Sequence, residues 1–74
     1  MNEEILTIEE KVHILRQNIK NLAYNRYNVE VSLIAESAVT MPNQANIDSF
    51  TIQLQEADEK ILALEEELAT IEGA

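Results

Sequence analysis

The sequence predicts an all-α fold of two long antiparallel helices, a coiled-coil-like helical hairpin that we expect to assemble into a homo-oligomeric helix bundle. Three observations support this. Apolar residues recur at alternating steps of three and four along most of the chain. Turn-forming residues are scarce, with one Gly and one Pro among 74 residues. The Pro lies where the apolar series would fold back on itself. Few turns mean few, long elements, so residues 1–74 are expected to form one domain.

The first helix is predicted over about residues 3–38 and the second over about 44–72, with the turn at about 39–43. Both helices carry apolar residues at the a and d positions of a heptad, which form the seam of a coiled coil. Pro42 removes a backbone donor and disfavours helix at the residue before it, while Asn43 or Asn46 is placed to cap the second helix and Gly73 to cap its end. The predicted seam consists of Ile5, Ile8, Val12, Leu15, Ile19, Leu22, Val29, Leu33, Ile47, Phe50, Leu54, Ala57, Ile61, Leu64, Leu68 and Ile71.

The pairing register follows from the position of the turn. Residue numbers that add to 83 face each other, which places Leu22 opposite Ile61 and the polar seam residue Arg26 opposite Ala57. A large side chain opposite a small one is what a filled layer needs, so Arg26 and Ala57 are predicted to specify the register. The alternative is that Arg26, like Glu36 at another seam position, simply extends outward into solvent.

Charge agrees with the fold-back. Residues 11–29 carry four basic and no acidic side chains, whereas residues 56–72 are strongly acidic. A hairpin lays these two segments side by side. The chosen register places Arg16 beside Glu65, and Arg26 near Asp58 and Glu30. Such exposed pairs guide the register more than they stabilise the fold.

A rival fold fits the same heptad frame, which runs unbroken through the proposed turn. One continuous helix in a parallel coiled coil would have the same periodicity. It would also place Pro42 in mid-helix, at a cost of about 3 kcal/mol per chain. Glu36, Thr40 and Asn43 would then occupy three successive core positions. These costs favour the hairpin.

A second apolar stripe is predicted on the first helix, about 150° around the helix from the seam. A hairpin covers only one of these faces, so the second stripe is predicted to be an interface, either between copies of the chain or with another protein. Tyrosines favour interface centres, which makes Tyr24 and Tyr27 the expected anchors. Helix 2 offers only scattered apolar residues off the seam. The stripe consists of Tyr24, Tyr27, Val31, Ile34, Ala38 and Met41.

Composition limits the function classes. The net charge of −9 argues against nucleic acid and anionic membrane surfaces as partners. The chain has no Cys, no long apolar run and an acidic start, from which we expect a cytoplasmic protein. The acidic run Glu65–Glu67 is typical of a solvated helix face, although it also resembles a site for a basic partner.

Catalytic and metal chemistry have little basis in this sequence. A single histidine would have to serve any nucleophile, and no glycine loop is present to bind an oxyanion or phosphate. Glu10 and His13 have the i, i+3 spacing of helical di-metal proteins, which require two such motifs and further inward glutamates. We therefore expect no enzyme and no cofactor.

The expected function is a non-catalytic protein–protein interaction module, an assembly factor, adaptor or small chaperone that acts as a homo-oligomer. The alternative is a structural subunit of a larger particle or complex, and a metal-binding helical bundle is less favoured.

Overall fold

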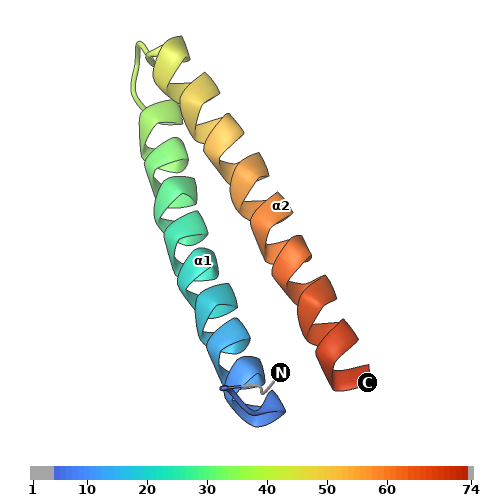
Figure 1. Ribbon diagram of the computed structural model, residues 1–74. Coiled ribbons are helices and arrows are strands. Elements are labelled where there is room, and N and C mark those ends of the chain that lie inside the picture. The colour runs from blue at the N-terminus through green and yellow to red at the C-terminus, as the bar shows by residue number, and fades with distance from the viewer. Residues whose placement is uncertain (1–4, 74) are drawn as a thin grey trace.

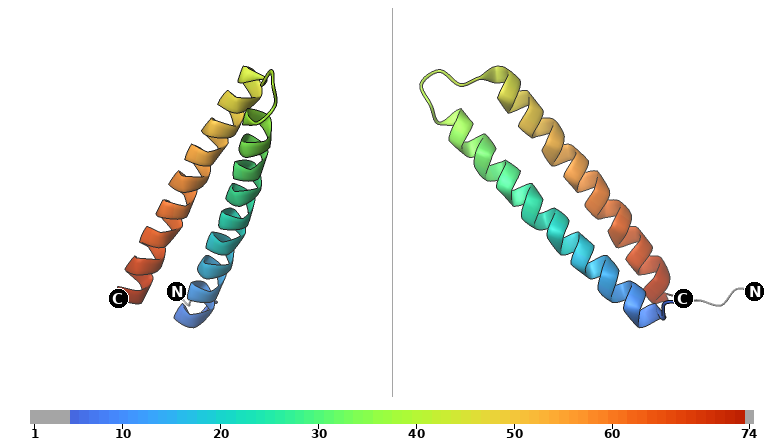
Figure 2. Two further views of the ribbon diagram at one scale, coloured as in Figure 1. Left: turned by 180° about the vertical axis from the view of Figure 1, so that it is seen from behind. Right: turned by 60° about the vertical axis from the view of Figure 1, so that its left-hand side comes forward.

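The protein is a two-helix antiparallel hairpin. The computed structural model describes residues 5–73, in which α1 spans Ile8–Ser37 and α2 spans Gln44–Gly73. The helices pack along their lengths, with the turn at one end and the start of α1 and the end of α2 at the other (Figures 1 and 2). The described residues include no strand. The predicted hairpin is confirmed, and the continuous helix of the rival parallel coiled coil is wrong.

The first helix begins later than the apolar pattern predicted. Thr7 is its N-cap, and the Thr7 hydroxyl accepts a hydrogen bond from the Glu10 amide at 3.1 Å. The Glu10 carboxylate accepts one from the Thr7 amide at 2.8 Å, which completes a capping box. Ile5 precedes this cap and is 93% exposed. The predicted helical residues 3–4 lie outside the described residues.

The turn is held by side chains at both of its ends. The Asn43 side-chain oxygen accepts a hydrogen bond from the Asn46 amide at 3.2 Å, so Asn43 caps α2 as one of the two predicted candidates. The Glu36 carboxylate accepts a hydrogen bond from the Asn43 amide at 2.9 Å and so bridges the turn. The predicted cap role of Gly73 is wrong, because Gly73 is the last residue of α2 and its φ is not positive.

The seam is where the two helices exclude water. From Val12 to Ile71, every predicted seam residue is half-buried, as are Arg26 and Glu36. None of the described side chains is fully buried, because two helices cover each other on one side only. Ile8 is exposed despite its seam spacing. Since α2 ends at Gly73, no residue of α2 stands opposite Ile8 in the pairing register.

Ion pairs join the helices along one edge of the seam. Arg26 donates to Asp58 at 2.6 Å and to Glu30 at 2.9 Å, as the register predicted. The predicted pairing of Arg16 with Glu65 is wrong, since Arg16 pairs with Glu72 at 2.6 Å.

The direction of helical side chains explains this difference. A side chain leans towards the N-terminus of its own helix. In antiparallel helices, Arg16 and Glu65 start at nearly the same level and lean apart, whereas Arg16 and Glu72 lean towards each other.

Candidate interaction surface

The second apolar stripe lies uncovered on α1. Tyr24 and Tyr27 are 66% and 63% exposed, although each would bury about 150–250 Å² if fully covered. Val31 and Ile34 continue the same helical face and are also exposed. The remaining two members lie at the end of α1 and in the turn, close to the predicted bounds. Ala38 is its C-cap and Met41 is an exposed residue of the turn.

The stripe is confined to the half of α1 nearest the turn. In the other half, the same three-and-four spacing passes through His13, Gln17 and Lys20, all of them exposed. One helix face therefore changes from polar to apolar between Lys20 and Tyr24.

The outer face of α2 is less apolar than the stripe on α1. Ile52 and Leu62 are 54% and 56% exposed, but they stand ten residues apart with Gln55 and Glu59 between them on the same face. This agrees with the expectation that α2 offers no continuous stripe.

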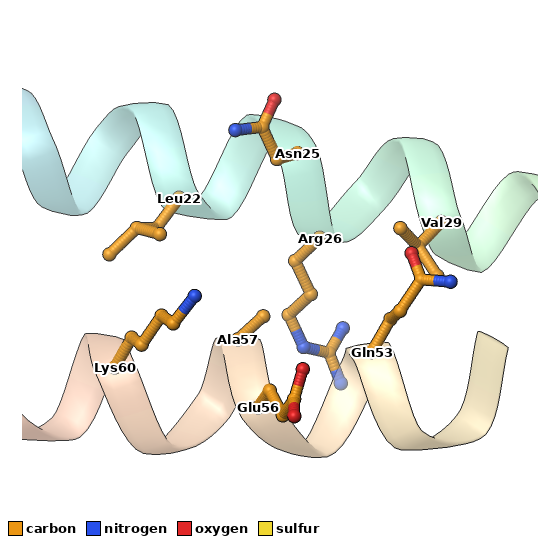
Figure 3. Close-up of a pocket in the computed structure, with 8 residues that line it drawn as sticks. All are labelled: Leu22, Asn25, Arg26, Val29, Gln53, Glu56, Ala57 and Lys60. Atoms are coloured by element: carbon orange, nitrogen blue, oxygen red, sulfur yellow. The ribbon is translucent and has the colours of Figure 1, made fainter. Parts of the chain in front are cut away.

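The layer of Arg26 and Ala57 is more open than the sequence suggested. Arg26 crosses from α1 towards α2 and passes between Ala57 and Gln53 (Figure 3). A groove of about 260 Å³ remains there, with Leu22, Asn25, Val29, Glu56 and Lys60 as its other lining residues. The small Ala57 side chain makes room for the guanidinium and leaves the layer incompletely filled.

The electrostatics of this layer favour a charged Arg26. Its hydrogen bond to Asp58, together with the charges of Asp58 and Glu30, raises the pKa of the Arg26 guanidinium above its ordinary value. The contact of Arg26 with Asp58 ties α1 to α2 near mid-seam, while Glu30 holds the guanidinium from within α1.

The candidate metal pair Glu10 and His13 lines one shallow groove near the start of α1, together with Leu6 and Ile14. The carboxylate of Glu10 already accepts the Thr7 amide of the capping box. Residues 5–73 bring no three His, Cys, Asp or Glu side chains together as a metal site would require. The reading of Glu10 from the sequence missed this capping role, although the Thr-x-x-Glu spacing that signals a capping box is present at Thr7.

Neither of the two helices has a stretch long and apolar enough to cross a membrane within the part of the chain that the structure describes. Comparison of the chain with protein-family models, with curated proteins and with solved structures finds no match.

Proposed function

We propose that this protein is a non-catalytic protein–protein interaction module that acts as a homo-oligomer, in the manner of an assembly factor, adaptor or small chaperone. The observation that carries the proposal is the uncovered stripe headed by Tyr24 and Tyr27. A contiguous apolar face of this kind, on a helix with charged residues elsewhere, is typical of an interface.

Size supports the homo-oligomeric form. A small chain seldom supplies enough core by itself and is commonly completed by association, and most oligomers of soluble proteins are homomeric. None of the described side chains of this hairpin is fully buried. A second copy would cover the stripe, which the hairpin alone leaves exposed.

The absence of a fully buried described side chain also favours the second candidate function, a structural subunit of a larger complex. This candidate predicts that the isolated protein is poorly ordered and becomes helical when its partner chain is added. High helicity and a sharp thermal transition of the isolated protein would contradict it. Both outcomes are read from circular dichroism during a thermal melt.

The decisive experiment compares two variants, each of which removes two exposed apolar side chains from one helix. Tyr24→Gln/Tyr27→Gln removes the anchors of the stripe, while Ile52→Gln/Leu62→Gln removes two side chains of similar exposure on the outer face of α2. Glutamine is a good helix former, so both variants should keep the seam and the hairpin.

Light scattering on a sizing column at several concentrations gives the mass of each variant. The wild type and the α2 variant should be oligomers, whereas the tyrosine variant should be a monomer of unchanged helicity. An oligomer that survives Tyr24→Gln/Tyr27→Gln, or a wild type that is monomeric at every concentration, would overturn the proposal.

A further inference from the structure

We infer that the stripe pairs two copies of the hairpin antiparallel, turn half against turn half, about a two-fold axis that passes between Val31 and Ile34. This inference rests on the proposed function and specifies the partner of its surface as a second copy in one orientation. The argument comes from the spacing of the stripe, its position along α1, and the charge of the rest of the molecule.

The spacing of the stripe is self-complementary in the antiparallel direction. If facing residue numbers add to 65, Val31 lies opposite the partner's Ile34 and Tyr27 opposite the partner's Ala38. Tyr24 then reaches the level of the partner's turn, which holds Met41. The largest side chain of the stripe meets the smallest, as the filling of a layer requires. A parallel pair would instead place tyrosine against tyrosine and alanine against alanine.

The position of the stripe along α1 determines how far the two copies overlap. The apolar residues extend from Tyr24 to the turn, and Lys20 begins the polar part of the same face. In the antiparallel pair, the partner's turn ends near Tyr24. Each copy therefore covers the whole apolar part of the other and leaves the polar part uncovered. The area buried is on the order of 500 Å² per copy, or about 1,000 Å² in all, which is the lower bound for a specific interface.

Charge decides between the two directions. The acidic segment 56–72 occupies the part of α2 remote from the turn. A parallel pair would bring two such segments to the same end of the dimer, where like charges repel. The antiparallel pair sends them to opposite ends. Within residues 24–41, which form the overlap, the only charged residues are Arg26, Glu30 and Glu36, and the first two pair with each other.

The test measures distances between spin labels in the full-length dimer. Gln17→Cys and Asn28→Cys each supply one exposed attachment site, since the chain has no native cysteine. In the antiparallel pair, the two labels at position 17 lie about 45 Å apart along the axis and those at position 28 about 14 Å. In a parallel pair, both positions would give separations near the helix spacing of about 10 Å, plus the label arms.

A long distance at position 17 with a short one at position 28 would support the inference. A dimer with short distances at both positions would overturn the antiparallel arrangement and leave the proposed self-association intact. If the protein stays monomeric at every concentration, with and without labels, both the antiparallel arrangement and the proposed self-association are overturned. Circular dichroism of each labelled variant establishes that the hairpin is retained.

Discussion

Arg26 bears on both the stability of the hairpin and the register in which its two helices pair. It occupies a seam position that an apolar residue would fill better, and it is held by Asp58 and Glu30 across and along the helices. A polar residue at one core position commonly fixes register or oligomeric state while it lowers stability. Because the three charged groups remain partly exposed, replacement of the arginine leaves no buried, unpaired carboxylate.

We therefore expect Arg26→Leu to raise the melting temperature and to weaken specificity. The apolar seam would become continuous, so other registers and the parallel coiled coil would compete with the hairpin. Circular dichroism should show a higher thermal midpoint, and light scattering should show a mixture of masses.

Arg16→Leu is the matched control for this change. Arg16 also pairs across the helices, but its side chain is 62% exposed and lies outside the seam positions. Its loss should alter the free energy of unfolding by less than about 1 kcal/mol and leave a single mass. A lower melting temperature for Arg26→Leu, or one sharp mass equal to that of the wild type, would contradict a register-specifying role.

At the scale of the helices, a hairpin places Leu22 opposite Ile61 of the same chain, and a long parallel coiled coil does not. The double variant Leu22→Cys/Ile61→Cys should form a disulfide within one chain under mild oxidation. The single variant Leu22→Cys should stay uncrosslinked, whereas a parallel coiled coil would place the two introduced thiols side by side and link two chains. Non-reducing electrophoresis separates these products.

The control for this experiment is Leu22→Cys/Leu54→Cys. Leu54 lies seven residues, or about 10 Å, along α2 from the position that faces Leu22. Disulfides need α-carbons within about 7 Å, so this pair should remain open. Rapid formation of a disulfide in the control variant would show that the helices slide past each other. The pairing in which facing residue numbers add to 83 would then not be fixed.

The helices and their register could be predicted from the sequence because periodic apolar residues and a single proline leave few other folds. The start of α1 could not be predicted from the period alone. Ile5 and Ile8 keep the seam spacing, but α2 ends before it could face them, and the capping box at Thr7 decides the boundary. The partner of Arg16 was missed because residue numbers give the level of a backbone position and not the lean of its side chain.

The exposed stripe was likewise predictable as far as Ala38, since helical spacing determines which residues share a face. Ala38, the C-cap, still follows that spacing, whereas Met41 lies in the turn, where the spacing no longer describes the backbone. The open groove beside Ala57 could not be foreseen, because the path of the Arg26 side chain depends on Asp58 and Glu30 together.

At the scale of the whole molecule, net charge opposes self-association, whereas the apolar interface favours it. Each copy carries −9, so two copies repel one another, yet the proposed contact is apolar and contains no ion pair between chains that salt could break. Added salt should therefore strengthen self-association. Between 10 mM and 150 mM ionic strength, the Debye length falls from about 30 Å to about 8 Å.

Sedimentation equilibrium at these two ionic strengths should show a dimer that is several-fold tighter at the higher one. The tyrosine variant serves as the control and should remain monomeric at both. Dissociation of the wild type by salt would mean that charges between chains, rather than the stripe, hold the copies together.

The absence of any fully buried side chain among the described residues has a consequence for the life of the protein in a cell. A lone hairpin whose whole seam touches water opens often, and proteases cleave opened chains in proportion to their population. Whatever covers the stripe reduces that population by binding only the closed form. We expect turnover to be fast for unpaired copies and slow for paired ones. The steady-state level of the protein would then follow the concentration of the chain that binds the stripe.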